Sequence, residues 1–312
     1  MRVRDLASYA FLICFTVLPM TSWATAADAQ TRLLHQERSL YRNIFVTQHD
    51  DERCMLFRYP RAYGRQSCRL LHDPDRMIFA YTQMMLTGLY LNPGPKRILI
   101  IGEGGGTIPS VLQQILPDAQ IDLVEIDKSV DDVARSYFDF KPGPKTRVAI
   151  EDGRVFVKRI MPQKPNYDLV LLDAFDADYV PEHMLTCEFL QEVKADMAPG
   201  GVIVANTFSN SALYDYESAT YHAVFGDFFN LRRGNRIILG RSGGIRPDDL
   251  SLARTNAMLL EPRLLKYGAS SKLLLPLLRT DVDWDRNARV LTDQYSPANL
   301  LNAMARRNRD VQ

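Results

Sequence analysis

The sequence predicts an α/β protein whose core is a doubly wound, mostly parallel β-sheet, preceded by a small layer of β-hairpins. From position 97 onward, short apolar segments alternate with helical segments, a pattern typical of βαβ units. Two of these apolar segments, 98–101 and 169–172, contain no polar residue, as expected for strands that are covered on both faces. Before position 75, β-forming segments instead follow one another with only short turns between them.

The first 29 residues have the layout of a secretory signal peptide. Arg2 and Arg4 precede an apolar stretch at 6–20, and small residues follow that stretch. The stretch is shorter than the roughly 20 residues that a membrane-spanning helix needs. We therefore predict that residues 1–29 are removed and that the protein is exported, either to a periplasm or out of the cell.

Residues 36–74 are predicted to form the antiparallel layer. The segments 39–48 and 52–59 are rich in β-forming residues, and the sequence His-Asp-Asp between them predicts a turn. Residues 65–71 are predicted to supply a third strand. A layer of this size does not fold alone, so it must pack on a larger core.

Cys54 and Cys68 lie within this layer, around a short stretch that contains Tyr-Pro-Arg-Ala-Tyr-Gly. The sequence is equally compatible with a disulfide between them, in an oxidising compartment, and with two free thiols. Cys187 lies in an apolar helical pattern and is predicted to be a small core residue. The cysteine spacing indicates no metal site, and 38 basic against 37 acidic residues do not indicate a nucleic-acid partner.

Residues 75–265 are predicted to form the main domain, and residues 266–312 a C-terminal extension that packs on it. The predicted strands are 97–101, 121–125, 147–151, 169–172, 202–206 and 235–240. The predicted helices are 75–91, 107–115, 128–138, 154–161, 181–197 and 247–260. Short strands that alternate with helices in this way predict a parallel sheet with helices on both faces.

A glycine-rich turn follows the first strand of the main domain, with the sequence Gly-Glu-Gly-Gly-Gly-Thr. Its glycines are Gly102, Gly104, Gly105 and Gly106. In doubly wound sheets, ligands bind at the carboxyl ends of the strands, and glycines there let a ligand approach the backbone. We predict that these four glycines contact a ligand; the alternative is a tight turn that binds nothing.

Acidic residues end the next two strands. Glu125 lies about twenty residues after the glycines, where a carboxylate suits a ribose diol. Asp152 and Gly153 follow the third strand, where the carboxylate can meet an adenine amino group. A pyrophosphate would favour helix amides over a group of carboxylates, so this pattern favours an adenosine with a cationic sulfonium over NAD.

Asp173 ends the fourth strand, and Asp176 and Asp178 follow it in the next loop. If the first and fourth strands are neighbours, Asp173 faces the glycine turn. A carboxylate there can hold a primary amine and take its proton, which the amine must lose before it can attack. The alternative for Asp176 and Asp178 is that they cap the following helix.

These residues together resemble the spermidine/spermine synthase family, the polyamine aminopropyltransferases, over about 39–208. The resemblance is carried by SLYRNIFV, ILIIGEGGGT, VEID, EDGR and YDLVLLDAFD. It implies a Rossmann-like fold of the class I methyltransferase type. It also implies transfer of an aminopropyl group from decarboxylated S-adenosylmethionine to an amine such as putrescine, without a metal. Asp173 would be the base and Asp176 a ligand of the acceptor amine, and such enzymes often pair as homodimers.

Three departures from the family pattern bear on the reaction. The family usually has an aspartate directly after the third glycine of its loop, where this sequence has Thr107. That aspartate selects the decarboxylated donor. The acceptor helix reads Tyr81-Thr82-Gln83 where the family has a glutamate at the third position, so Tyr81 and Gln83 are predicted acceptor contacts with one carboxylate missing. The segment YVPEHMLT replaces the usual proline-glycine loop, which is typical of a divergent, spermidine-synthase-like subgroup.

Two alternative functions therefore stay open. The first is methyl or other group transfer from ordinary S-adenosylmethionine, which Thr107 would permit. The second is non-catalytic binding of a polyamine or nucleoside, because an exported protein would meet little of a donor that is made in the cytoplasm. His183 is predicted to be a surface or helix-packing residue and not a base.

Overall fold

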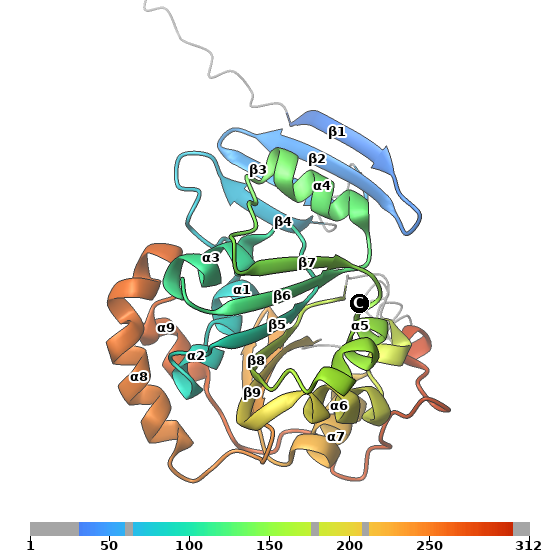
Figure 1. The fold of residues 1–312 in the computed structure, drawn as a ribbon, viewed down its shortest axis with the longest axis vertical. Coiled ribbons are helices and arrows are strands. Elements are labelled where there is room, and N and C mark those ends of the chain that lie inside the picture. The colour runs from blue at the N-terminus through green and yellow to red at the C-terminus, as the bar shows by residue number, and fades with distance from the viewer. Residues whose placement is uncertain (1–30, 60–64, 176–180, 208–211, 302–312) are drawn as a thin grey trace, which may run out of the picture. The chain divides into compact units, whose positions relative to one another are not determined.

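The strands of the protein form two separate sheets in this computed structural model, which describes residues 31–59, 65–175, 181–207 and 212–301 (Figure 1). The smaller sheet is antiparallel in the order β1-β2-β3-β4. Its strands are β1 (Arg32–Arg38), β2 (Asn43–His49), β3 (Glu52–Leu56) and β4 (Arg65–Leu70). The sequence did not predict β1, because Arg-Leu-Leu-His-Gln-Glu-Arg has little β-forming character and becomes a strand by pairing with β2.

The larger sheet has the order β10-β11-β9-β8-β5-β6-β7. Its strands are β5 (Arg97–Ile101), β6 (Gln120–Glu125), β7 (Thr146–Ile150), β8 (Tyr167–Leu172), β9 (Met197–Thr207), β10 (Phe229–Arg233) and β11 (Asn235–Arg241). The first five of these strands are parallel, and β10 and β11 add an antiparallel hairpin to β9. The strand order reverses between β5 and β8, which confirms the doubly wound α/β fold and places a ligand-binding crevice there.

Helices cover both faces of this sheet (Figure 1). The α-helices are α1 (Ala80–Met85), α2 (Gly88–Leu91), α3 (Thr107–Ile115), α4 (Lys128–Tyr137), α5 (Gly153–Ile160), α6 (Cys187–Ala195), α7 (Tyr214–Phe225), α8 (Asp249–Leu264) and α9 (Ser271–Leu274). Single 3-10 turns lie at Met161–Gln163, Glu182–Met184, Leu265–Tyr267 and Leu275–Leu277. Among the described residues, no helix has both the length and the apolar character that a membrane span requires.

Two predicted helices are shorter in the structure. The helix predicted at 75–91 begins only at Ala80 and is divided into α1 and α2. Before it, the Met77 N–H donates to the Tyr267 carbonyl at 3.0 Å and so bonds to the C-terminal segment. The helix predicted at 181–197 is a 3-10 turn followed by α6, which begins where the Thr186 hydroxyl accepts the N–H of Phe189. Side-chain caps of this kind fix a helix start that periodicity alone leaves open.

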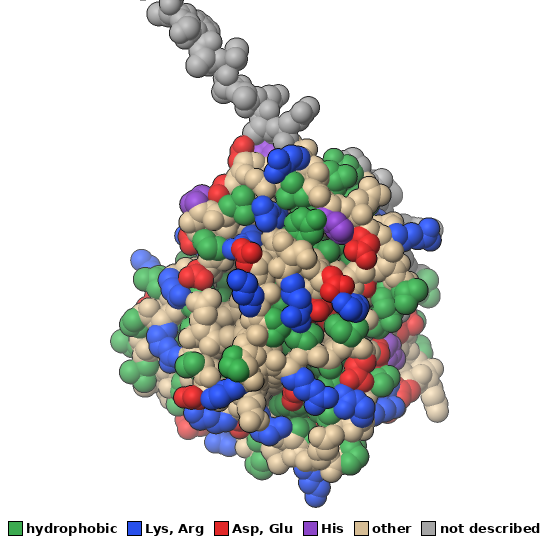
Figure 2. Space-filling view, turned by 45° about the horizontal axis from the view of Figure 1, so that its top comes forward, with side chains coloured by type: hydrophobic (Ala, Val, Ile, Leu, Met, Phe, Trp, Pro, Cys, Tyr) green, Lys and Arg blue, Asp and Glu red, His purple; other side chains and the backbone are tan. Residues whose placement is uncertain are grey.

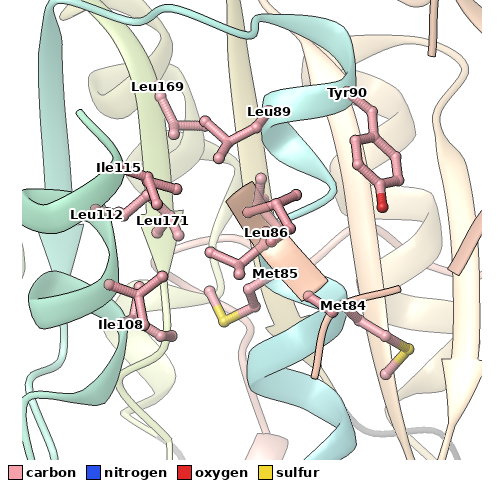
Figure 3. Packing of buried hydrophobic residues seen from close by; sticks show 14 of the residues in the cluster. Met84, Met85, Leu86, Leu89, Tyr90, Ile108, Leu112, Ile115, Leu169 and Leu171 are labelled. Atoms are coloured by element: carbon pink, nitrogen blue, oxygen red, sulfur yellow. The ribbon is translucent and has the colours of Figure 1, made fainter. Parts of the chain in front are cut away.

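The core lies on the two faces of the larger sheet. On one face, α1, α2, α3 and α8 contribute to a single apolar cluster, and Figure 3 shows Met85, Leu89 and Leu112 packed beside Leu169 and Leu171 of β8. On the other face, α5, α6 and α7 form the second cluster. A third cluster joins β2 and β3 to α4, so the small sheet packs on the main domain as predicted. Basic and acidic side chains are interspersed over the face that Figure 2 shows, which agrees with the net charge of +1.

A disulfide joins β3 to β4. Cys54 and Cys68 are directly paired cross-strand partners with their Cα atoms 4.1 Å apart, and their sulfurs are bonded. The structure therefore selects the disulfide from the two alternatives that the sequence left open. Both cysteines are buried, and the segment between them spans 14 positions.

Reduction of this disulfide should destabilise the protein. Closing a loop of this length in the unfolded chain removes conformational entropy equivalent to about 3 kcal/mol, so a reducing agent should lower the free energy of unfolding by roughly 2–4 kcal/mol in urea titrations. The Cys54→Ser/Cys68→Ser variant is the control, since its stability should not respond to the reducing agent. An unchanged urea midpoint, with thiol titration showing that the pair has been reduced, would contradict the prediction.

Candidate active site

The ends of β5 and β8 approach each other so closely that only glycine fits between them. Gly102 has a φ of 101°, and a Cβ atom built on it would lie 2.1 Å from the carbonyl oxygen of Asp173. The Asp173 N–H also donates to the Ile101 carbonyl at 2.8 Å, which continues the pairing of the two strands to their ends. The glycine turn and Asp173 therefore face one crevice, as the sequence predicted from the strand order.

A cavity of about 580 Å³ opens at these strand ends. Its size falls within the range of ligand pockets for small molecules and suits a nucleoside with a side chain. The predicted site residues that line it are Tyr81, Gly102, Gly104, Thr107, Glu125, Asp152, Gly153 and Asp173. The structure thus brings residues from the ends of four strands, and one from α1, to a single hollow.

Three predicted contacts do not line this cavity. Gly105 and Gly106 lie under the turn, where the Gly105 N–H donates to the Ser67 hydroxyl at 2.8 Å and Gly106 packs on the Phe140 ring. Gln83 is not among the residues that line the cavity, and its amide donates to the Met77 carbonyl at 2.8 Å. The geometry gives no support to acceptor binding by Gln83, since its side chain holds the segment before α1. Asp176 lies outside the described residues, as does Asp178.

Glu125 is held in place by backbone amides on both of its oxygens. Oε2 accepts the N–H of Glu103 at 3.1 Å, and Oε1 accepts the N–H of Asp127 at 3.0 Å. Each oxygen keeps a second lone pair, and the two together can accept from a diol. Burial raises the pKa of Glu125 against the lowering effect of these two bonds. The carboxylate is therefore oriented before any ligand arrives.

Asp152 has two roles in the structure, of which the sequence predicted neither. Its Oδ1 caps α5 by accepting the N–H groups of Arg154 and Val155 at 2.9 and 3.0 Å. Its Oδ2 lies 2.8 Å from Nε2 of His183, which also lines the cavity. His183 is exposed, as the sequence predicted, and the 3-10 turn Glu182–Met184 also brings its ring to the rim of the site. Only Oδ2 is left to meet an adenine amino group.

Asp173 carries a carboxyl group whose ionisation is finely balanced. Its pKa is raised to about 7, mainly by burial; a hydrogen bond from Asn206 lowers this pKa and the nearby Glu125 charge raises it, and the value is the net result of the three effects. The Asn206 amide donates to Oδ1 of Asp173 at 2.9 Å. A general base works best with a pKa near the working pH, so this carboxylate is suited to accept a proton from an amine. Tyr81 lines the same end of the cavity, stacked on Phe79 with ring centroids 5.9 Å apart.

Glu103 is a buried acid of the site that sequence reasoning missed. The side chain lies in the glycine turn and lines the cavity, and the residue is 6% exposed. Burial, with the neighbouring Asp131 and Glu125 charges, raises the pKa of Glu103 to about 9, so the carboxyl is neutral at pH 7. Neither of its oxygens accepts a hydrogen bond from a described residue, and the neutral form can donate to Asp131. The sequence feature that could have indicated this residue is the glutamate within the glycine-rich turn.

Comparison with known proteins agrees with this geometry. A family model for the spermine/spermidine synthase domain matches residues 78–230. The chain is also 41% identical to a polyamine aminopropyltransferase of Vibrio vulnificus, over 96% of this chain and the whole of that relative. The chain belongs to this family. It is accordingly a transferase, and aminopropyl transfer in polyamine biosynthesis is the activity that this membership supports.

Two solved structures place the same fold in a wider group. A probable spermidine synthase from Corynebacterium glutamicum superposes with a TM-score of 0.61 at 21% identity, covering 80% of this chain and 96% of that one. Human methyltransferase-like protein 13, solved in complex with SAH, has a TM-score of 0.52 at 28% identity, covering 60% of this chain and 93% of that one. Aminopropyltransferases thus share their sheet with methyltransferases, and the fold alone does not choose between the two reactions.

Replacing the half-buried acid Asp173 by asparagine should stabilise the protein. A carboxyl whose pKa rises from about 3.9 in the unfolded chain to about 7 in the folded one costs folding free energy once it ionises. The cost is absent below pH 4, grows between pH 4 and pH 7, and is constant above. Urea titrations at pH 8 should therefore show Asp173→Asn more stable by roughly 1–3 kcal/mol, a value reduced from the full shift because the group is partly hydrated.

The same titrations at pH 4.5 should show a much smaller gain. An equal change in stability at the two pH values would mean that asparagine acts through its shape and not through the missing charge. Asp118→Asn is the matched control, since Asp118 is an exposed carboxyl that pairs with Lys145 and lies outside the cavity.

Replacing Glu125 by glutamine should weaken nucleoside binding in this family member. Glutamine has one acceptor oxygen instead of two, so one of the loop amides and part of the diol contact are lost. Hydrogen bonds to charged groups contribute about 1.5–3 kcal/mol, and the dissociation constant of methylthioadenosine should rise roughly 10- to 100-fold in calorimetry. Asp118→Asn should bind as the unmodified protein does, and tight binding by Glu125→Gln would contradict the assigned diol contact.

Proposed function

We propose that the protein transfers an aminopropyl group from decarboxylated S-adenosylmethionine to a primary amine such as putrescine, with Asp173 as the general base. One observation carries the proposal. A carboxyl group with a pKa near 7 faces a glycine turn across the strand crossover, inside a nucleoside-sized cavity that Glu125 and Asp152 also line. Glu125 is assigned to the ribose diol and Asp152 to the adenine amino group.

The reaction balances with the residues of this chain. The amine nitrogen loses a proton to the Asp173 carboxylate and attacks the propyl carbon bonded to sulfur. The new C–N bond forms as the C–S bond breaks, and the electron pair of that bond leaves on sulfur as neutral methylthioadenosine. Base catalysis of this kind contributes about 10²–10⁴-fold, and holding the two reactants in line contributes more.

A second candidate is group transfer from ordinary S-adenosylmethionine. Thr107 supports it, because this neutral residue lines the cavity at the first position of α3 and offers no charge against a donor carboxylate. The likeness to a methyltransferase solved with SAH also supports it. Family membership favours the aminopropyl reaction, so ordinary S-adenosylmethionine is the competitor that an assay must include.

We also propose that the protein is exported and that it forms a homodimer. The signal-like composition of residues 1–29 supports export, and so does the Cys54–Cys68 disulfide, since such bonds persist mainly in oxidising compartments. A homodimer through the antiparallel sheet is supported by analogy with the family and by the exposed apolar side chains Leu33 and Leu40 close to its edge strand β1.

Turnover with the two donors tests the proposal. The purified protein, with decarboxylated S-adenosylmethionine and putrescine, should release methylthioadenosine, and kcat/KM should fall as the pH drops below about 7, because Asp173 becomes protonated. Asp173→Asn should lose at least 100-fold in kcat. Turnover with ordinary S-adenosylmethionine alone would favour the second candidate. Binding of the donor with no more turnover than the Asp173→Asn control would indicate a non-catalytic binding protein.

A further inference from the structure

A pair of asparagines connects Asp173 to the antiparallel edge of the main sheet. Asn206, at the end of β9, donates its amide N–H to Oδ1 of Asp173 at 2.9 Å. Asn235, at the start of β11, donates its own amide N–H to Oδ1 of Asn206 at 3.0 Å. Both asparagines line the cavity, and Asn206 is 8% exposed. The order Asn235, Asn206, Asp173 is a chain in which every bond points toward the carboxylate.

The direction of this chain fixes the orientation of the Asn206 amide. An asparagine amide can present either its N–H₂ or its carbonyl to a neighbour. Because the Asn235 N–H₂ occupies the carbonyl of Asn206, the Asn206 N–H₂ must face Asp173. A donor in that place stabilises the ionised carboxylate, whereas a carbonyl there would require Asp173 to keep its proton.

The support behind Asn235 is rigid, although Asn235 itself is exposed. The next residue, Arg236, is fully buried and holds the start of β11 by three bonds. Its guanidinium donates to Asn230 Oδ1 at 2.9 Å, to Ser218 Oγ at 2.7 Å and to the Tyr214 carbonyl at 3.2 Å. The antiparallel pairing of β11 with β9 places Ile237 opposite Asn206, so the two asparagines stay in register.

We propose that Asn206 is a positioning residue for Asp173 and that Asn235 holds Asn206 in its working orientation. This inference rests on the proposed role of Asp173 as the base. Asn206 fixes which oxygen of the carboxylate stays free for the amine, namely Oδ2, and it keeps the carboxylate ionised in a site that otherwise favours the acid. The other groups that act on Asp173 from the described elements are Glu125 on β6, which opposes ionisation, and the Tyr81 hydroxyl on α1.

The test is the titration of Asp173 in variants that keep the local volume. Asn206→Leu has nearly the same shape but no donor, so the pKa of Asp173 should rise by about 1–2 units, as expected from losing a bond worth 1.5–3 kcal/mol. Asn235→Ala leaves Asn206 in place but frees its amide to turn, and the rise should be smaller. The acid limb of kcat/KM should move up in pH by the same amounts.

A second readout separates this inference from the proposed reaction. Carbon-13 NMR of protein labelled at the aspartate carboxyls gives the pKa of Asp173 directly. The Asp173 signal is assigned as the one that is missing from the spectrum of Asp173→Asn. Unchanged titration in Asn206→Leu would overturn the inference even if activity fell at every pH. A shifted titration in a protein that transfers no aminopropyl group would support the asparagine chain and reject the proposed function. If Asn206→Leu fails to fold, the exposed substitution Asn235→Ala provides the test instead. An unchanged pKa of Asp173 in that variant would contradict the proposed role of the two asparagines.

Discussion

The contact between the ends of β5 and β8 is the constraint on which the site depends. No side chain fits at Gly102, because the Asp173 carbonyl oxygen occupies the place of its Cβ. This contact sets the distance between the nucleoside turn and the proposed base, and it does so through backbone pairing that loops cannot alter. Flanking strands then add one carboxylate each, Glu125 from β6 and Asp152 after β7. The positions of these three carboxyl groups are therefore set by the ends of neighbouring strands at the sheet crossover.

The cavity holds more acid than it can keep ionised. Burial raises the pKa values of Glu103, Glu125 and Asp173, and the charge of Glu125 adds to the increase for Glu103 and for Asp173. A cation in the cavity has the opposite effect, since an opposite charge nearby favours the ionised carboxylate. A sulfonium donor would thus lower the pKa of the base as it binds and leave Asp173 ready for the proton of the amine. In the proposed reaction, formation of the C–N bond moves that positive charge from sulfur to the nitrogen of the new secondary amine, and the thioether that leaves is neutral.

Sequence periodicity predicted the features that depend on one strand or one turn. The parallel strands, the glycine turn and the acids at strand ends all follow from local pattern, and the structure places Glu125, Asp152 and Asp173 around one hollow. The features that depend on tertiary pairing could not be predicted in this way. Gln83 was expected beside the acceptor, but the helix begins late and its amide is taken by Met77. Asn235 lies about sixty positions from Asp173, and only the β9–β11 pairing brings it near.

The small antiparallel sheet contributes to the site through its strand β4. Ser67 of β4 accepts the N–H of Gly105 and so fixes the glycine turn from outside the main sheet. The next residue, Cys68, lines the cavity and carries the disulfide to β3. A four-stranded sheet of this size has little core of its own, so its position depends on the packing of β2 and β3 on α4. The disulfide therefore ties down the residue next to Ser67, whose hydroxyl accepts from the turn on which the nucleoside would rest.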